Sequence, residues 1–400
     1  MKILILNAGS SSLKYQLIDM DGEKLLAKGI AERIGIEGSK ISQKAGDKSF
    51  EQEKPMKDHT AAIELMLKAL TDSEVGALTN MDEIAAVGHR VLHGGERFTG
   101  SVRINQDVKD AIRANIPLGP LHNPANLMGI EACEKVMPRT PNVAVFDTAF
   151  HQTMPKKAYL YGVPIEYYRK LHIRRYGFHG TSHRYVSKRA CDFLGIDRTK
   201  TRVITCHLGN GSSLAAVDRG RCVDTSMGLT PLEGVIMGTR SGNLDPAVVQ
   251  FIANNDNMTV DQVLDLLNKK SGLVGLSGKS SDMRDIDALC DQGDEDSIVA
   301  RDMLVASIRK YIGAYAAVMN GVDVIVFTAG IGENNIQLRS MVMDGFEYLG
   351  AKLDESKNNT RVEAIISADD SNVKIVVIPT DEEIVIARDT LAIVTGADIE

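Results

Sequence analysis

Three charged residues stand where a polar side chain can do chemistry. Arg90 ends an apolar run just before His93-Gly94-Gly95, and Asp147 ends a second apolar run. An arginine beside a glycine turn at a strand end can hold a carboxylate through two parallel hydrogen bonds. Arg240 lies between glycines, in G-T-R-S-G, where a cation suits negative charge that develops on a phosphoryl group. Asp147 fits an active-site carboxylate at a strand end, or a residue that caps the next turn.

Two histidines four residues apart follow in Y-G-F-H-G-T-S-H, residues 176–183. On a helix this spacing would suit a metal pair. Gly177 and Gly180, however, predict that His179 lies in the turn before a helix of residues 182–194. We therefore expect His183 to be structural.

Glycine- and serine-rich tips recur after apolar strands. Residues 3–19 and 203–217 each form a strand, a small tip and a second strand, with Ser-Ser-Leu in common, and a strand at 322–327 runs into Gly330-Ile331-Gly332. Such tips expose backbone N–H groups that can bind phosphate. A single Gly-Asn-Gly would be read as an ordinary hairpin turn. The repeat instead predicts two phosphate-binding hairpins and a nucleotide loop.

Two other nucleotide-binding motifs match the sequence only in part, because required residues or neighbouring elements are missing. L-V-G-L-S-G-K-S, residues 273–280, lacks the first glycine of a P-loop and follows a predicted helix, residues 260–269. The late G-x-G is shared with nicotinamide dehydrogenases, but it lacks the third glycine and the acidic residue that follows in those enzymes. Neither a P-loop NTPase nor a dehydrogenase is therefore favoured.

The chain resembles the acetate and propionate kinase family. The resemblance rests on nine blocks in family order: L-N-A-G-S-S-S-L-K (6–14), H-R-V-L-H-G-G (89–95), P-L-H-N-P-A-N (120–126), F-D-T-A-F-H (146–151), Y-G-F-H-G-T-S-H (176–183), H-L-G-N-G-S-S (207–213), G-T-R-S-G-N-L-D-P (238–246), F-T-A-G-I-G-E-N (327–334) and P-T-D-E-E (379–383). It implies an α/β fold of two domains of the actin-like, sugar-kinase-like ATPase superfold. Each domain has a mixed β-sheet core flanked by helices, and the active site lies in the cleft between them.

The resemblance implies reversible, Mg²⁺-dependent, in-line phosphoryl transfer from ATP to acetate, giving acetyl phosphate and ADP. Mn²⁺ is a possible substitute for Mg²⁺. The implied catalytic residues are Asp147, His179 and Arg240, and the implied acetate-binding residues are Arg90, Leu92, Leu121, Phe178 and Pro231. The implied nucleotide-binding residues are Ser10, Ser12, Lys14, His207, Leu208, Gly209, Asn210, Gly211, Asp282, Met283, Arg284, Gly330, Ile331, Gly332, Glu333 and Asn334. Asn7 and Glu382 are the implied metal residues, with Glu383 as the alternative to Glu382.

Two details of this chemistry stay open. Acetate is already ionised at neutral pH, so no strong base is needed and catalysis is mostly positioning and charge neutralisation. Asp147 then orients Arg90 or a metal-bound water, although family descriptions often give it an acid–base role. Leu92 stands where many relatives have valine, which predicts a smaller pocket that favours acetate over propionate.

Bulk properties exclude several classes of protein. A 400-residue chain with a formal charge of −7 is long enough for two or three domains and has no basic footprint for nucleic acid. Five scattered cysteines, without a C-x-x-C pair, indicate a reducing compartment, and no apolar run is long enough for a membrane span. We expect a cytoplasmic homodimer, the dimer by resemblance alone.

The expected domains are residues 1–150, completed by a C-terminal helix at 385–400, and residues 151–384. A closure of the two domains around the nucleotide is expected. Local signals predict that Asn123 caps a helix before Pro124, that a helix begins near Asn335, and that Thr380 caps the last helix. A propionate kinase and a non-catalytic nucleotide-binding module remain the alternative functions.

Overall fold

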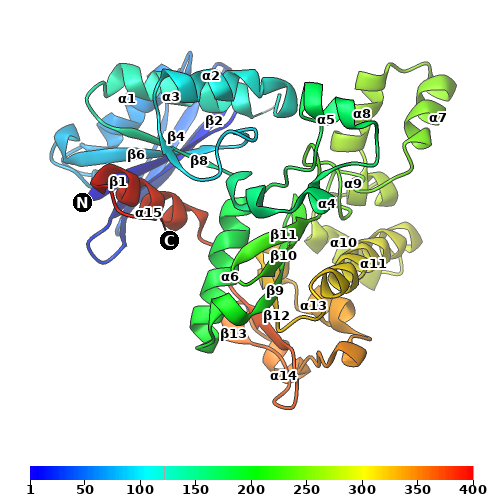
Figure 1. Cartoon of the computed structure of the whole chain (residues 1–400). Helices are drawn as coiled ribbons and strands as arrows, with labels where there is room; N and C mark the ends of the chain where they lie inside the picture. The colour runs from blue at the N-terminus through cyan, green and yellow to red at the C-terminus, as the bar shows by residue number, and fades with distance from the viewer. Residues whose placement is uncertain (121, 400) are drawn as a thin grey trace. The chain divides into compact units, whose positions relative to one another are not determined.

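The computed structural model describes residues 1–120 and 122–399 of the chain (Figure 1). Contacts divide the chain into two compact units. Unit 1 contains Met1–Ala149 together with the chain from Asp381 onward, and unit 2 contains Phe150–Thr380. Glu382 and Glu383 therefore belong to the same unit as Arg90 and Asp147. Among the described residues, no helix combines the length and apolar character needed to cross a membrane.

Unit 1 is built on an eight-stranded mixed sheet. Its strands, in spatial order, are β5 (Lys48–Glu53), β4 (Lys40–Ala45), β3 (Lys24–Glu32), β2 (Ser12–Asp19), β1 (Lys2–Ala8), β6 (Ile84–Val91), β8 (Asn142–Phe146) and β7 (Val102–Arg103). β1 and β2 form an antiparallel hairpin, while β1, β6 and β8 run parallel. The carboxyl ends of these three strands, which carry Asn7, Arg90 and Asp147, therefore lie at one edge of the sheet.

Helices cover both faces of this sheet. α1 (His59–Leu70) and α3 (Asn123–Val136) pack on the face that presents Leu4 and Leu6, and α2 (Gln106–Ala114) packs beside α3. α15 (Glu382–Thr395) packs on the opposite face, against β1, β6 and β8 (Figure 1). A Cβ atom at Gly88 of β6 would lie 2.6 Å from Ile386 and 2.4 Å from Thr390. Glycine is needed there because the helix approaches the strand so closely.

Unit 2 contains a six-stranded mixed sheet with helices on both faces. The strand order is β11 (Arg221–Thr225), β10 (Ser212–Asp218), β9 (Arg202–Leu208), β12 (Val324–Thr328), β14 (Lys374–Val377) and β13 (Ala364–Ile365). Alternate residues of β9 face opposite sides. Val203 joins the core under α6 (Gly180–Leu194), whereas Ile204 joins the core under α11 (Glu295–Val318) (Figure 1).

The two sheets share one core topology. In unit 1 the order β3-β2-β1-β6-β8 has an antiparallel hairpin followed by two parallel strands. In unit 2 the order β11-β10-β9-β12-β14 has the same strand directions. The predicted duplicated α/β fold is thus confirmed. Both glycine-rich hairpins occupy the same place in their sheets, and so do the strand ends that follow them.

Shorter helices complete unit 2. They are α4 (Lys156–Tyr159), α5 (Ile165–Leu171), α7 (Ala247–Asp256), α8 (Val260–Lys269), α9 (Gly272–Ser277), α10 (Met283–Asp291), α12 (Ala329–Asn334), α13 (Ile336–Met343) and α14 (Glu355–Asn358). α9 occupies most of the L-V-G-L-S-G-K-S segment. This segment is therefore helical where a P-loop would require a loop after a strand.

Two predicted helix caps were wrong, and the predicted nucleotide loop differs in one respect. Asn123 does not cap α3, because its side chain is buried and bonds the backbone of His93 and Ile112 instead. A helix does begin near Asn335 as predicted, because Asn335 caps α13 by accepting from the Leu338 N–H. The nucleotide loop before it, however, is itself a short helix, α12, which begins directly after the strand through Ala329 at φ +64°. The cap of α15 is Asp381, whose carboxylate accepts from the Ile384 N–H, whereas Thr380 bonds Ser182 and Glu333.

Candidate active site

Arg90, Asp147 and Glu382 form the polar centre of unit 1. Asp147, which is fully buried, accepts from Arg90 Nε at 3.1 Å and from Nη2 at 2.7 Å. Glu382 Oε2 lies 3.9 Å from Arg90 Nε. The charge of Asp147 raises the pKa of the Arg90 guanidinium above its usual range. Asp147 uses one edge of the guanidinium, so the N–H groups of its other edge can bind a second planar anion.

Glu382 is crowded by other carboxylates at the start of α15. Burial, together with the charges of Asp147 and Glu383, raises the pKa of Glu382 to about 7, although Arg90 acts in the opposite direction. Because negative charges meet here, a cation at this point would relieve the repulsion. Among the described residues, no three His, Cys, Asp or Glu side chains are gathered as metal ligands. A metal at Glu382 must therefore take its other ligands from water, substrate or an amide.

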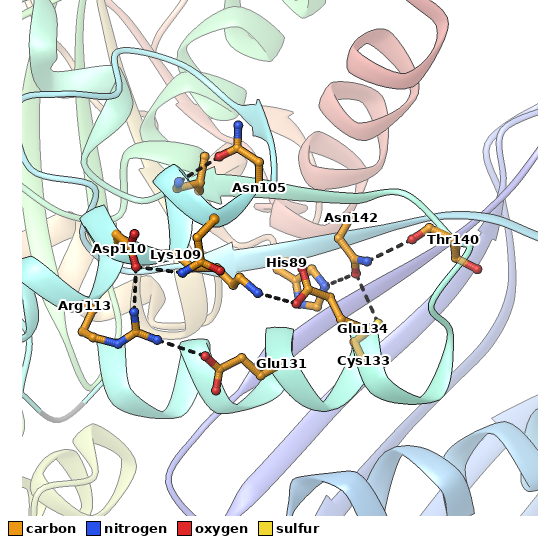
Figure 2. A network of polar contacts seen from close by, with 12 residues as sticks. His89, Asn105, Lys109, Asp110, Arg113, Glu131, Cys133, Glu134, Thr140 and Asn142 are labelled. Atoms are coloured by element: carbon orange, nitrogen blue, oxygen red, sulfur yellow. Dashed lines mark hydrogen bonds and ion pairs between the residues drawn. The ribbon is translucent and has the colours of Figure 1, made fainter.

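A layer of polar side chains joins β6, which carries Arg90, to β8 and α3. His89, which directly precedes Arg90, bonds Asn142 of β8 at 2.7 Å, and Asn142 also accepts from the Cys133 thiol of α3 (Figure 2). Lys109 of α2 donates to Glu134 of α3 in the same layer. Burial lowers the pKa of His89 to about 4, so the ring is neutral at physiological pH.

Two asparagines of α3 fix the turn that follows Arg90. Asn126 accepts from the Leu92 N–H and donates to the carbonyl of Ala8, which joins this turn to the first hairpin. Asn123 brackets His93 by accepting from its N–H and donating to its carbonyl. Leu92 is buried against these contacts. Sequence reasoning gave Asn126 no role and made Asn123 a helix cap, although both lie in the family block of residues 120–126.

The first hairpin presents small and polar residues beside a cavity. Ser10 and Lys14 are exposed and Ser12 is half-buried, while the Gly9 N–H donates to the Ser12 carbonyl across the tip. Asn7, Lys14 and Glu383 line a cavity of about 550 Å³ in unit 1. Asn7 therefore shares a cavity with Glu383, while Glu382 lies beside Arg90. The predicted acetate-pocket residue Leu121 lies outside the described residues.

His179 occupies a strained turn before α6. Its φ is +56°, and that of Gly177 is +74°, which is the left-handed region that disfavours side chains. A Cβ atom at Gly177 would lie 2.4 Å from Thr225 and 2.8 Å from His151. His151 also donates from Nε2 to the carbonyl of Phe178, which is itself buried. Contacts at Gly177 and at the Phe178 carbonyl therefore hold this turn. His179 lies before the helix, as predicted.

Arg240 and His179 lie at the tip of the second hairpin. A Cβ atom at Gly211 would lie 3.4 Å from Arg240 Nη1 and 3.6 Å from both Cε1 and Nε2 of His179. Arg240 is half-buried, and its hydrogen-bond partners are Pro231 O and Met237 Sδ. No carboxylate of the described residues pairs with it, and burial lowers the pKa of its guanidinium. A partly desolvated cation beside backbone N–H groups suits an anionic ligand.

A second arginine holds the irregular segment that leads to Arg240. Arg175 donates from Nη1 to the carbonyls of Thr225, Ser226 and Met227, and it pairs with Glu233 at 2.6 Å. Glu233 also accepts from Tyr161. Arg175 thus contacts the same segment that contains Pro231, whose carbonyl accepts from Arg240. Sequence reasoning missed this residue, because its partners are backbone carbonyls of a distant segment.

A larger cavity of about 990 Å³ in unit 2 gathers most of the predicted nucleotide segments. Gly209, Asn210, Asp282, Met283, Arg284, Gly330, Ile331 and Asn334 line it, together with Ser281, Asp287, Asn335, Ile336, Gln337 and Arg361. Of the predicted nucleotide-binding residues in unit 2, His207, Leu208, Gly211 and Gly332 are absent from the lining. Glu333 is also absent and instead accepts from the Thr380 N–H. Asn335 was expected only as a helix start, and Arg361 gave no motif signal.

Arg284 pairs with Asp282 at this cavity. It donates to both carboxylate oxygens of Asp282, at 3.0 and 2.6 Å, on an exposed surface. Asn210 approaches from the hairpin, since a Cβ atom at Gly238 would lie 2.0 Å from its Oδ1. The cavity thus combines a hairpin tip, a helix start and α12, which are suited to phosphates and a sugar.

Residues 2–388 match the family model described as the acetokinase family. The chain belongs to the acetokinase family. It is 58% identical to the acetate kinase of Thermotoga maritima, over 98% of this chain and 99% of that protein. The crystal structure of Porphyromonas gingivalis acetate kinase superposes with a TM-score of 0.95, at 47% identity over 98% of this chain and 99% of that chain. A propionate kinase from Francisella tularensis superposes with a TM-score of 0.91, at 41% identity over 98% and 99% of the two chains. The predicted family is confirmed.

Proposed function

We infer that this acetokinase is an acetate kinase, a phosphotransferase that moves a phosphoryl group between ATP and acetate. The observation that carries this function is the full-length identity of 58% to a curated acetate kinase. The charge pattern of the site supports it, because each unit contains an arginine suited to an anion. Arg90 has a planar, bidentate geometry, and Arg240 has no carboxylate partner among the described residues.

Arg90 binds the acetate carboxylate and Asp147 orients Arg90. The double hydrogen bond between these two side chains supports this role for Asp147, since it fixes the plane of the guanidinium. An acetate ion then bonds the N–H groups that Asp147 does not use. Acetate needs no base to become a nucleophile at neutral pH. The assignment of Asp147 as a general base is therefore the less favoured one.

His179 and Arg240 stabilise the transferring phosphoryl group. Their side chains border the glycine at the tip of the second hairpin, which supports a role at phosphate. Both can place positive charge or an N–H donor on equatorial oxygens, and such contacts strengthen as charge develops in the transition state. We assign the nucleotide to the cavity of unit 2, with Asp282, Met283, Arg284, Gly330, Ile331 and Asn334 around its base and ribose.

Asn7 and Glu382 are the residues that would hold Mg²⁺. The crowding of carboxylates that raises the pKa of Glu382 fits a cation, and Mg²⁺ typically takes one or two protein oxygens and completes its shell with water and phosphates. When bound, Mg²⁺ neutralises charge on the phosphates of ATP. Glu383 shares a cavity with Asn7 and is the alternative. A comparison of the Mg²⁺ concentration that gives half-maximal activity in Glu382→Gln and Glu383→Gln separates the two.

Leu92, Leu121, Phe178 and Pro231 are the proposed pocket for the acetate methyl group. Leu92 and Phe178 are buried, apolar side chains. Propionate kinase activity is the second candidate function, supported by the Francisella tularensis structure at 41% identity. One methylene changes specificity by only about 1–3 kcal/mol. Leu92→Val should therefore raise kcat/KM for propionate relative to acetate.

A homodimer is supported by exposed apolar side chains on packed helices of unit 2. α7 buries no residue within the described chain, and it exposes Val248 and Phe251, while its neighbour α8 exposes Val260 and Leu264. We propose that these helices contribute to the dimer contact.

ATP as a substrate and five buried cysteines that form no disulfide support a cytoplasmic location.

The test is ADP formation from ATP and Mg²⁺ with acetate, propionate or butyrate. A higher kcat/KM for acetate is the expected result, and better use of propionate would favour the second candidate. Arg240→Ala should lower kcat far more than it raises KM, because its contact forms mainly in the transition state. Arg90→Ala should chiefly raise KM for acetate. No turnover in a folded protein that binds ATP would indicate a non-catalytic nucleotide-binding module.

A further inference from the structure

Three buried side chains form a continuous row of hydrogen bonds behind His179. Ser213 Oγ of β10 lies 2.8 Å from His179 Nδ1 and 2.8 Å from His183 Nε2. His183 lies one turn further along α6, and its Nδ1 is 2.7 Å from Thr205 Oγ1 of β9. Thr205 Oγ1 also reaches the carbonyl of Ala215, at 3.5 Å. His183, Thr205 and Ser213 are fully buried, so water does not compete for these bonds.

Counting protons gives this row a direction. A carbonyl can only accept, so Thr205 donates its hydroxyl proton to Ala215 and accepts from His183 Nδ1–H. Burial and the nearby His151 and His207 rings hold the pKa of His183 well below its usual value, so His183 is neutral and its Nε2 accepts. Ser213 has one proton, which it donates to that nitrogen. Ser213 must then accept a proton from His179 Nδ1–H.

We propose that His183 is a positioning residue that acts through Ser213 to keep His179 protonated on Nδ1, which leaves Nε2 as the nitrogen that serves the phosphoryl group. This inference rests on the role proposed above for His179. The Nε2 edge of the ring faces Gly211, at the tip of the hairpin. Nδ1 is committed to Ser213, so proton gain or loss occurs at Nε2. The charged state of His179 also requires this direction, because both of its nitrogens then donate.

Aromatic rings and a hydroxyl group help to keep His179 in this orientation. The His207 ring stacks on His179 with a centroid distance of 4.1 Å, and Ser182 bonds His207 Nδ1 at 2.7 Å. Arg240 borders the same glycine as His179, and the His151 ring lies 5.6 Å from His183. In the familiar catalytic triad a carboxylate fixes the tautomer of the histidine. In this row a neutral histidine and a serine hydroxyl have that role.

The test measures the tautomers of His179 and His183 in the full-length protein with ¹⁵N-labelled histidine. NMR distinguishes a protonated ring nitrogen from an unprotonated one, and His179→Gln and His183→Gln spectra assign the signals. Both rings should carry the neutral-form proton on Nδ1 in the wild type. A neutral-form proton on Nε2 of either ring would overturn the proposal without any further variant.

Thr205→Val should reverse the direction of the hydrogen bonds in the row. The substitution is at the end of the row farthest from His179, so it leaves the His179 side chain itself unchanged. Valine cannot accept from His183 Nδ1–H, and a buried unpaired N–H is unfavourable. The His183 proton should therefore move to Nε2, Ser213 should turn toward His179, and the His179 proton should appear on Nε2. Thr205→Ser keeps the hydroxyl and is the matched control, which should retain the wild-type tautomers.

Kinetics separate positioning from a general loss of structure. In Thr205→Val, kcat should fall by about tenfold or more with KM for acetate unchanged, and its dependence on pH should become shallower. Thr205→Ser should keep both kcat and its dependence on pH at the wild-type values. If His179 keeps its Nδ1 proton in Thr205→Val, or if the two variants behave alike, the row does not control the tautomer. A fully active His179→Gln would instead remove the role proposed for His179, whatever the tautomers show.

Discussion

Asp147→Asn separates an orienting role from a basic one. The substitution keeps the shape of the side chain and removes its charge. Asp147 is fully buried, and its two bonds to Arg90 are 3.1 and 2.7 Å long. Removing one partner of a fully buried ion pair costs about 3–5 kcal/mol. The Arg90 side chain is 28% exposed and Glu382 lies 3.9 Å away, so screening lowers the expected loss to about 2–3 kcal/mol.

The same geometry predicts the kinetic result. Without the charge of Asp147, the Arg90 guanidinium can rotate. KM for acetate should therefore rise about tenfold to hundredfold, equivalent to a loss of about 1.4–2.8 kcal/mol in binding free energy. The turnover number should change far less, because Arg90 still binds acetate once it is saturating. The midpoint of thermal unfolding should fall by about 4–12 °C for a domain of this size. The assays are initial rates against acetate concentration and a calorimetric scan.

Arg202 and Asp323 provide a matched pair at another site. Arg202 donates to Asp323 through Nε at 3.0 Å and through Nη2 at 2.7 Å, and no proposed ligand contacts either residue. Asp323→Asn should lower stability and leave KM for acetate unchanged. The reasoning would be refuted if Asp147→Asn left KM for acetate unchanged while kcat fell several hundredfold, because that pattern indicates a general base.

Three further predictions follow from burial and close approach. His89 has a pKa of about 4 in the folded chain against 6.5 as its ordinary value, so the unfolded chain binds the extra proton and stability falls by up to about 3 kcal/mol as pH drops from 6.5 to 4. In His89→Gln, denaturant unfolding should show a smaller loss of stability over this range. Gly238→Ala would place a Cβ atom 2.0 Å from Asn210 Oδ1, so KM for ATP should rise while KM for acetate stays near the wild-type value. Gly177→Ala combines φ +74° with a contact of 2.4 Å to Thr225, so it should destabilise unit 2 by about 2 kcal/mol or more and lower kcat through His179, as measured by urea unfolding and initial rates.

The outline of this protein follows from local sequence signals. Apolar runs that end in glycine and serine predicted both hairpins, because a buried strand must stop where small residues allow a turn. The helix at residues 260–269 was also predicted from the sequence, and it matches α8. The nine motif blocks predicted the family, which the comparison over residues 2–388 confirms. These features depend on neighbours in the chain, so a single sequence contains them.

Local signals failed where a side chain bonds a distant partner. Asn123 has the sequence context of a helix cap, but His93, thirty residues earlier, takes its side chain. Thr380 likewise bonds Ser182 of α6, which left Asp381 to cap α15. A cap contributes only about 1 kcal/mol. Satisfying the polar groups of a buried asparagine therefore outweighs it.

Tertiary structure alone decided how the charged residues pair. The sequence separates Arg90, Asp147 and Glu382 widely, and nothing in it states that one carboxylate takes two bonds from the arginine while another lies 3.9 Å away. Parallel strands bring the first two to one sheet edge, and the C-terminal helix brings the third. The direction of the row from Thr205 to His179 likewise depends on which buried groups meet. Hydrogen bonds and desolvation act through space, so residue types determined the available chemistry and the fold determined which atoms take part in it.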